Sequence, residues 1–546
     1  MKKVFLFLAL LPMMAFSQTD AKTIMVVTDP HVFAPSLYDE GEAFTTMMNG
    51  QRKMIDLSSE IWEALLDTAL SRKPDLLLIP GDLTKDGEIE SHNVVREGLL
   101  RLKNAGINSL VIPGNHDIGG KAYSYFGETK TEVAVLSNDA WESKYDWVYQ
   151  QAKAKDTDSH SFVAEPFSGV TVIGIDGSHD KAGTGSLSDA TLNWILSQAD
   201  KARKKKNIVL AMSHWQLVDH FDGQSTLEPA CRLANADAIR DSLMHHGVQI
   251  LLTGHFHVNG ITTFRDTTGL TNDSIIEITT GAPITFPCPF RWLTISGDRS
   301  TVDVQTQNIE SIASHRSLFG YSEGWMREHT TNMIPEQSLR IWNKADSYID
   351  EGVDKLVSGI PSSTLAMMEL YLGFTVDKLK DDIKAAMPQT DEEKISLVQD
   401  NIGEAVIELY LIHSEANEPD NFFAEYWADA LYNGLENMIN TIANRMPYLS
   451  SIGMQGIVAA PLIKLADDLA HEIVQSLVED KTHWNSENFS DVTDDLELSI
   501  QVKAPSGTEG VENVTDNLQP VKLIRDGQVL IQRGEKTYTV QGQEVR

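Results

Sequence analysis

The chain has 546 residues, more than a single hydrophobic core usually organises, so we expect about two to four domains. Its 78 Asp and Glu residues outnumber 45 Lys and Arg residues, which leaves a formal net charge of −33. This acidic balance excludes a protein that binds a nucleic-acid duplex through a broad basic face, and it argues against docking on anionic lipid through polybasic patches.

Residues 1–17 have the pattern of a secretory signal peptide. Lys2 and Lys3 precede an apolar run over residues 4–16, and Ala15-Phe16-Ser17 is a small-x-small cleavage site. We therefore expect the mature chain outside the cytoplasm, in the periplasm, on the cell surface or secreted. Because no later segment offers about 18 uninterrupted apolar residues, we expect no transmembrane segment.

Residues 18–310 alternate short apolar runs with amphipathic stretches. The runs are rich in Val, Ile and Leu and are typical of strands buried on both faces; they span residues 24–28, 75–79, 109–112, 170–175, 208–212 and 249–253. Helical periodicity lies between them, for example over residues 57–70, 90–103, 189–202 and 234–246. This alternation predicts an α/β sandwich. Over residues 261–304 the helical pattern stops, and we expect an antiparallel second sheet there.

The composition changes near residue 311. Long stretches with a period of 3.6 residues, separated by prolines, predict an all-α domain over residues 311–490. A polar linker is expected over residues 491–520. Turn signals such as Asp526-Gly527 predict a short β tail over residues 521–546. The tail resembles the C-terminal sorting signals of cargo exported by type IX secretion, and a plain β-hairpin extension is the alternative.

Five polar sequence motifs follow apolar strands of the predicted sandwich. They are Asp29-Pro30-His31, Gly81-Asp82, Gly114-Asn115-His116-Asp117, His214 and Gly254-His255-Phe256-His257. Ligands of open α/β sheets gather beyond the carboxyl ends of the strands, so we expect all five motifs at one rim.

The donor atoms of these motifs predict a pair of metal ions. Apart from His116 and Asp117, the motifs offer two carboxylates, one carboxamide oxygen and four imidazoles, a mixed N/O set that suits Mn, Fe or Zn. Seven donors are too many for one tetrahedral zinc, but they suit two divalent ions about 3.5–4 Å apart. The chain has only two cysteines, Cys231 and Cys288, which is too few for a Cys-rich metal module. A disulfide between them is possible.

The same motifs, in this order, resemble the pattern of the calcineurin-like metallophosphoesterases over about residues 22 to 305. The stretches 81–87, Gly185-Ser186-Leu187 and Gly281-Ala282-Pro283 look like the branch that includes cyclic-nucleotide phosphodiesterases. Lys85 stands where purple acid phosphatases carry a metal-binding tyrosine, which argues against a ferric purple-type centre. The resemblance implies a four-layer α/β/β/α sandwich, which the all-α domain and the β tail would follow.

The resemblance also implies a role for each motif residue. The residues that would hold the first ion are Asp29, His31, Asp82 and His257; those that would hold the second are Asp82, Asn115, His214 and His255. Asp82 would bridge the two ions. His116 would protonate the leaving group, supported by Asp117. The implied substrate contacts are Asn115, His116 and His214.

Together with the expected signal peptide, these roles imply a secreted phosphoester hydrolase in which a hydroxide bridging the metals attacks phosphorus. The leading hypothesis is a phosphodiesterase. A nucleotide and a phospholipid headgroup are both compatible substrates. A phosphomonoesterase that uses the same site is the first alternative. The second is a metal-stabilised scaffold without catalysis, whose helical domain binds a partner at the cell surface.

Overall fold

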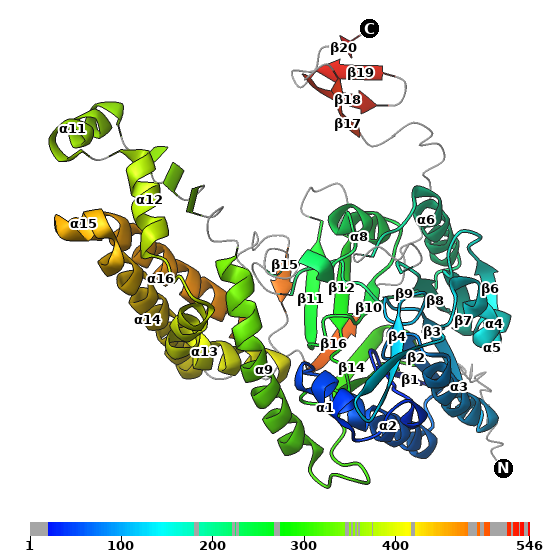
Figure 1. Cartoon of the computed structure of the whole chain (residues 1–546). Coiled ribbons are helices and arrows are strands. Elements are labelled where there is room, and N and C mark those ends of the chain that lie inside the picture. The colour runs from blue at the N-terminus through cyan, green and yellow to red at the C-terminus, as the bar shows by residue number, and fades with distance from the viewer. Residues whose placement is uncertain are drawn as a thin grey trace, which may run out of the picture. The chain divides into compact units, whose positions relative to one another are not determined.

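A computed structural model of the chain is shown in Figure 1. It describes residues 20–178, 185–220, 224, 229–266, 273–343, 349–350, 353–354, 357–358, 361–373, 375–415, 421–478, 489–491, 496–502, 521–525, 528–533, 536–539 and 544–545. The expected signal peptide and most of the expected linker lie outside these residues. Within the described part of the chain, no helix combines the length and hydropathy needed to cross a bilayer.

The first of two large sheets has six strands in the order β16-β14-β13-β1-β2-β3. Its strands are β1 (Lys22–Val26), β2 (Leu76–Pro80), β3 (Asn108–Ile112), β13 (Pro289–Ile295), β14 (Thr301–Asn308) and β16 (Glu497–Gln501). β1, β2 and β3 are parallel, whereas β13, β14 and β16 extend the sheet in antiparallel fashion beyond β1. The carboxyl ends of the three parallel strands therefore share one edge.

The second large sheet has eight strands in the order β15-β11-β12-β10-β9-β8-β7-β6. Its strands are β6 (Ala152–Lys155), β7 (Phe162–Phe167), β8 (Val170–Ile175), β9 (Ile208–Ser213), β10 (Ile250–Thr253), β11 (Gly260–Arg265), β12 (Ser274–Thr279) and β15 (Phe489–Asp491). β8, β9, β10 and β12 are parallel neighbours. A separate hairpin of β4 (Ala122–Phe126) and β5 (Thr129–Val133) follows β3 in sequence.

The prediction that residues 261–304 form a second sheet of their own is wrong. β11 and β12 lie in the eight-stranded sheet, and β13 and β14 lie in the six-stranded sheet. The prediction of strands in this segment is confirmed. These strands complete the open edges of two sheets that already exist, because an unpaired edge leaves backbone N–H and C=O groups without partners.

Period-two alternation explains why the strands are buried on both faces. Along β9, Ile208, Leu210 and Met212 enter the core between the sheets, whereas Val209 and Ala211 enter a second core beneath the outer helices. The helices of that outer layer are α6 (Asp189–Lys204) and α8 (Ala236–His245), and those beside the first sheet are α2 (Ser58–Arg72) and α3 (Ile89–Asn104). The N-terminal region is thus the expected four-layer α/β/β/α sandwich (Figure 1).

The shorter helices lie in the connections of the sandwich. They are η1 (Pro35–Leu37), α1 (Glu42–Asn49), η2 (Ile55–Leu57), η3 (Asn138–Ala140), α4 (Trp141–Lys144), α5 (Asp146–Gln151) and η4 (Pro229–Cys231). Cys231 and Cys288 are both buried and do not form a disulfide.

A helical region follows β14, as expected. Its helices are α9 (Leu318–Trp342), α11 (Ser362–Leu372), α12 (Val376–Ala386), α13 (Asp391–Glu415), α14 (Asn421–Arg445), α15 (Pro447–Ser451) and α16 (Gly456–Val478). α9 packs on α13, α13 on α14, and α14 on α16. After these helices the chain returns to the sandwich, where β15 pairs with β11 and β16 pairs with β14. This return differs from the linker expected over residues 491–520.

Residues 505–546 form a compact unit of their own. Its strands are β17 (Val521–Arg525), β18 (Gln528–Arg533), β19 (Lys536–Thr539) and β20 (Glu544–Val545), which pair in antiparallel fashion in chain order. The β tail is therefore a four-stranded meander.

Leu210→Ala tests the core between the sheets. Leu210 is fully buried, so we expect the free energy of unfolding, measured by urea denaturation, to fall by roughly 2–5 kcal/mol. The matched control is Leu370→Ala on α11, whose side chain is 77% exposed; we expect it to change stability by less than about 0.5 kcal/mol. Equal effects of the two substitutions would contradict this account of the core.

Candidate metal centre

The five polar motifs meet at the carboxyl ends of parallel strands from both sheets. Asp29 and His31 follow β1, Asp82 follows β2, and Asn115 follows β3. His214 follows β9, and the motif with His255 and His257 follows β10. The structure brings the six His and Asp residues of this set into two adjoining groups that could hold metal ions.

The first group comprises Asp29, His31, Asp82 and His257, whose donor atoms all lie within 4.8 Å of one another. His257 Nε2 lies 3.2 Å from Asp29 Oδ1 and 3.1 Å from His31 Nε2. His31 Nε2 lies 3.5 Å from Asp82 Oδ2. Two imidazole nitrogens and two carboxylate oxygens therefore face one point.

The second group comprises Asp82, His214 and His255. His214 Nε2 lies 3.3 Å from Asp82 Oδ2 and 3.1 Å from His255 Nδ1. Asn115 Oδ1 adds a neutral oxygen 2.9 Å from His214 Nε2. Asp82 Oδ2 faces both groups, which is the position a bridging ligand needs.

The spacing of the donor atoms fits the expected ions. Ligands around one ion with bonds of roughly 2.0–2.2 Å lie roughly 3.0–3.6 Å apart. The distances between adjacent donor atoms, from 2.9 to 3.5 Å, fall close to this range. The outer ring nitrogens of two histidines are engaged elsewhere, since His214 Nδ1 lies 3.1 Å from Pro80 O and His255 Nε2 lies 3.2 Å from Ala230 O. Such contacts orient the ring so that its other nitrogen points at the metal.

Five of the donor residues have left-handed backbone conformations. The φ angles are 53° at Asp29, 40° at His31, 50° at Asp82, 67° at His255 and 64° at His257. Non-glycine residues rarely adopt positive φ, and each such residue costs about 1–3 kcal/mol. Strain of this kind persists where the surrounding structure imposes it, and it clusters at functional sites.

Two motif glycines let the backbone approach the carboxylates. A Cβ atom at Gly254 would lie 2.2 Å from Asp29 Oδ2, and one at Gly114 would lie 2.1 Å from Asp82 Oδ1. Any side chain at either position would displace a donor carboxylate. The glycines of the Gly-Asn-His-Asp and Gly-His-x-His motifs are therefore required by packing at the site.

The electrostatics of the buried site call for cations. Burial alone would raise the pKa of Asp82, but the charges of His214 and His116 hold it well below its usual value. Burial alone would lower the pKa of His214, but Asp82 and Asp29 raise it to about 9. Burial, together with the charge of His214, lowers the pKa of His255 to about 3. The two buried carboxylates thus attract positive charge, which the His214 imidazolium supplies here, and the imidazole of His255 is neutral and available as a ligand.

His116 lies at the mouth of the site, where its side chain is 34% exposed. Its backbone N–H donates to Asp82 Oδ1 at 2.8 Å, and its ring lies 5.0 Å from that of His31. The partner of its Nδ1 atom is Asp86 Oδ1, at 3.0 Å. Asp86 lies within the Gly81–Gly87 stretch but is not among the predicted site residues, because sequence alone does not show which acid faces a histidine.

The structure gives Asp117 a role different from the predicted support of the His116 side chain. Its carboxylate accepts hydrogen bonds from the backbone N–H groups of Leu83, Thr84 and Gly114, at 2.9–3.1 Å. Asp117 therefore ties the loop after β2 to the loop after β3. Its backbone oxygen lies 2.8 Å from Nε2 of His92, a fully buried residue that sits beneath the loop.

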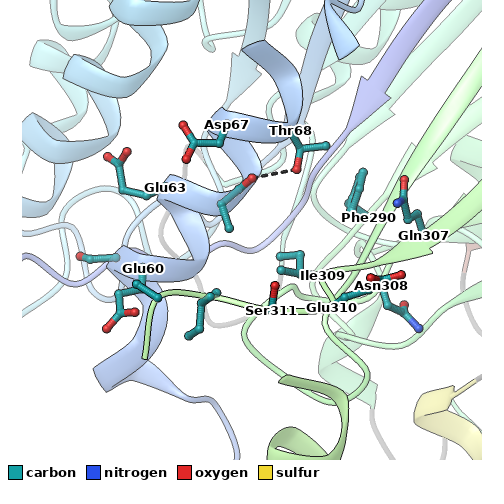
Figure 2. A pocket seen from close by; sticks show the side chains of 14 residues that line it. Glu60, Glu63, Asp67, Thr68, Phe290, Gln307, Asn308, Ile309, Glu310 and Ser311 are labelled. Carbon is teal, nitrogen blue, oxygen red and sulfur yellow. Dashed lines mark hydrogen bonds between the residues drawn. The ribbon is translucent and has the colours of Figure 1, made fainter. Parts of the chain in front are cut away.

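A pocket of about 620 Å³ lies elsewhere, between α2 and the segment that leads from β14 to α9 (Figure 2). Acidic side chains of Glu60, Glu63 and Asp67 project from α2, and Phe290 and Ile309 contribute apolar surface. None of the candidate metal ligands lines it. The candidate metal centre and this pocket are therefore separate sites.

The chain is similar in sequence to known phosphoesterases. Residues 22–259 match the family model of the calcineurin-like phosphoesterases. A probable glycerophosphodiester phosphodiesterase from Arcobacter nitrofigilis is 28% identical over 233 residues, which cover 42% of this chain and 71% of that protein.

Two solved structures are also similar. A dimetal phosphatase from Danio rerio aligns with a TM-score of 0.39 and 14% identity, covering 53% of this chain and 96% of that one. The purple acid phosphatase from yellow lupin (Lupinus luteus) seeds aligns with a TM-score of 0.35 and 11% identity, covering 53% of this chain and 52% of that one.

Gly254→Ala tests the close approach to Asp29. Because the added Cβ would overlap Asp29 Oδ2, we expect the purified protein to lose at least half of its bound metal in elemental analysis. Gly120→Ala is the control, since a Cβ there meets nothing within 4 Å. Full metal content in both variants would refute the packing argument.

Asp82→Asn tests whether the carboxylate of Asp82 serves both donor groups. Removal of the one carboxylate that faces both groups should reduce the metal content from two ions to fewer than one per chain, since a carboxamide is a weaker ligand. Asp67→Asn, an exposed position on α2, should retain both ions. If Asp82→Asn kept two stoichiometric ions, the bridging position would be wrong.

Proposed function

Because residues 22–259 belong to the calcineurin-like phosphoesterase family, we propose that this metal-dependent phosphoester hydrolase cleaves phosphodiesters outside the cytoplasm. The observation that carries the proposal is the position of Asp82 Oδ2, which lies 3.5 Å from His31 and 3.3 Å from His214. A carboxylate oxygen shared in this way suits a two-metal hydrolase. Similarity to the probable glycerophosphodiester phosphodiesterase of Arcobacter nitrofigilis supports a diester substrate.

The donor residues would hold the two ions from one side and leave the other side of the ions accessible to the phosphoester. When bound, two divalent ions lower the pKa of water and neutralise charge on phosphoryl oxygens. Asp29, His31 and His257 would hold one ion; Asn115, His214 and His255 would hold the other, and Asp82 would contact both. The fixed loops keep these donors in position before substrate arrives, so little reorganisation is needed during reaction.

His116 is suited to donate a proton to the leaving oxygen. It lies at the mouth of the site, and it is not needed as a metal ligand. Its Nδ1 atom lies 3.0 Å from Asp86 Oδ1, and this contact holds the ring in one orientation. The hydrogen bond from its backbone to Asp82 ties its position to that of the metal pair.

The location outside the cytoplasm rests on the N-terminal segment. Two lysines, an apolar run over residues 4–16 and a small-x-small site support export. N-terminal sequencing of protein recovered from culture medium and cell fractions should find a chain that begins near Gln18. A chain that keeps residue 1 would contradict export by cleavage.

The proposed activity is tested by comparing two chromogenic substrates. Hydrolysis of bis-p-nitrophenyl phosphate should exceed that of p-nitrophenyl phosphate, should stop with chelator and should return when Mn²⁺ is added. Preference for the monoester would favour a phosphomonoesterase. Metal binding without hydrolysis of either substrate would favour the scaffold.

His116→Ala should keep both ions and lower kcat about 10²–10⁴-fold for a diester with an alkyl leaving group. The loss should be much smaller for a p-nitrophenolate leaving group, which needs little protonation. His471→Ala, at a half-exposed position on α16, is the control and should match the unsubstituted protein. Undiminished turnover of the alkyl diester by His116→Ala would remove the residue from the acid role.

A further inference from the structure

Glu277 is a fully buried carboxylate within β12. Its strand neighbours Ile275 and Ile278 are fully buried apolar residues that belong to the two cores of the sandwich. Glutamate is disfavoured in strands, and a buried carboxylate is unfavourable unless hydrogen bonds satisfy its oxygens. Glu277 belongs to neither donor group of the metal centre. A glutamate at this position therefore indicates that its oxygens have specific partners.

One oxygen of Glu277 holds the segment that follows His214. Glu277 Oε2 accepts hydrogen bonds from the backbone N–H groups of Leu217 and Val218, both at 2.9 Å. These two residues are buried, and they lie beyond the end of β9, outside its hydrogen-bond ladder. A buried N–H group needs an acceptor, and the carboxylate supplies one for both groups. The path of the chain after His214 is thus fixed by a side chain from β12.

The other oxygen of Glu277 holds the end of β10, which leads to His255. Thr253 Oγ1 donates to Glu277 Oε1 at 3.0 Å, and Thr253 is the last residue of β10. The N–H of the next residue, Gly254, donates to His214 O at 3.2 Å. The two strand ends that carry His214 and His255 are therefore tied to each other and to one carboxylate.

His220 closes this network on the side of β11. Its Nε2 atom lies 3.4 Å from Glu277 Oε1 and 3.0 Å from Thr279 Oγ1. Its Nδ1 atom lies 3.1 Å from Thr262 Oγ1, on β11. The side chain of His220 is only 4% exposed, so little water competes for these contacts. A buried polar network whose members are paired is rigid and specifies one arrangement.

The contacts of Glu277 concern the second donor group more than the first. The two imidazoles of the second group follow β9 and β10, the strands whose ends Glu277 holds. Three of the four residues of the first group follow β1 and β2 in the six-stranded sheet, to which β12 does not belong. The fourth, His257, lies further along the chain from Thr253 than His255 does. Loss of the Glu277 contacts should therefore disturb the second group first.

We propose that Glu277 is a positioning residue for the second metal ion, which keeps His214 and His255 at the spacing that this ion requires. The ring nitrogens in question, His214 Nε2 and His255 Nδ1, lie 3.1 Å apart. This inference rests on the proposed function, since it takes the two donor groups as the sites of its two ions. Substitution of a residue that orients metal ligands typically lowers metal affinity about 10–100-fold.

Titration calorimetry with Mn²⁺ tests the proposal on the full-length protein, after a chelator has removed its metal. Glu277→Ala removes both oxygens, so it should weaken binding of the second ion about 10–100-fold and leave binding of the first within about threefold. His255→Ala lacks a donor of the second group alone, and it identifies the binding event that belongs to the second ion.

A conservative variant and a matched control accompany this measurement. Glu277→Gln keeps one acceptor oxygen for the two N–H groups, so we expect a smaller loss for the second ion, about three- to tenfold. Thr171→Val is the control, because Thr171 is buried near the start of β8 and accepts a hydrogen bond from Asn207 Nδ2 at 3.0 Å. It should lower the melting temperature and keep both Mn²⁺ affinities, since the metal centre lies at the opposite strand ends.

The activity at different metal concentrations gives a second readout. Glu277 is fully buried and does not reach substrate, so Glu277→Ala should hydrolyse diesters within about threefold of the unsubstituted rate once Mn²⁺ saturates both sites. At limiting Mn²⁺ its rate should fall with the occupancy of the second site. A low rate at saturating Mn²⁺, with normal affinity for the second ion, would overturn the positioning role.

Unchanged affinity for both ions in the Glu277 variants overturns the proposal, and Glu277→Gln alone decides it if the alanine variant does not fold. An equal loss for both ions, or a loss confined to the first, also overturns it, because Glu277 would then support the rim in general. Failure of the proposed function is distinguishable, since these affinities are measured without substrate. A protein that binds two Mn²⁺ ions and hydrolyses no diester still reports on Glu277.

Discussion

The carboxylate of Asp82 is the point on which the rest of the site depends. One oxygen accepts the backbone N–H of His116, and the other faces His31 and His214. These residues come from both sheets, so a shared oxygen is possible only where the strand ends of the two sheets coincide. The hydrophobic core between the sheets, to which alternate residues such as Leu210 and Met212 contribute, keeps the two rims in register.

The donor residues keep this arrangement although their backbone is locally strained. Asp29, Asp82 and His255 are among five donor residues with positive φ, and the carboxylates of Asp29 and Asp82 crowd against Gly254 and Gly114. Buried core and loop hydrogen bonds, including those of Asp117, offset the cost. The benefit is a set of donors that is already in position, which is the condition under which electrostatic stabilisation of a reaction is most effective.

The helical region is part of this arrangement and not a separate attachment. Tyr410 contacts Arg52 and His413 contacts Phe256, so the loop before η2 and the loop after β10 both contact α13.

Local sequence determined the strands, the glycines and the seven predicted metal ligands, because period-two burial and donor chemistry are properties of short segments. It also determined that the described residues between 318 and 478 are mainly helical, since breakers and periodicity are local too. It did not determine how residues 261–304 divide between the sheets, or that residues 489–491 and 497–501 return to pair with β11 and β14. Those outcomes depend on which distant strand edges are open. The contact of Asp86 with His116 and the backbone role of Asp117 were likewise decided only by the tertiary structure, because a polar side chain acquires its role from neighbours that folding brings to it.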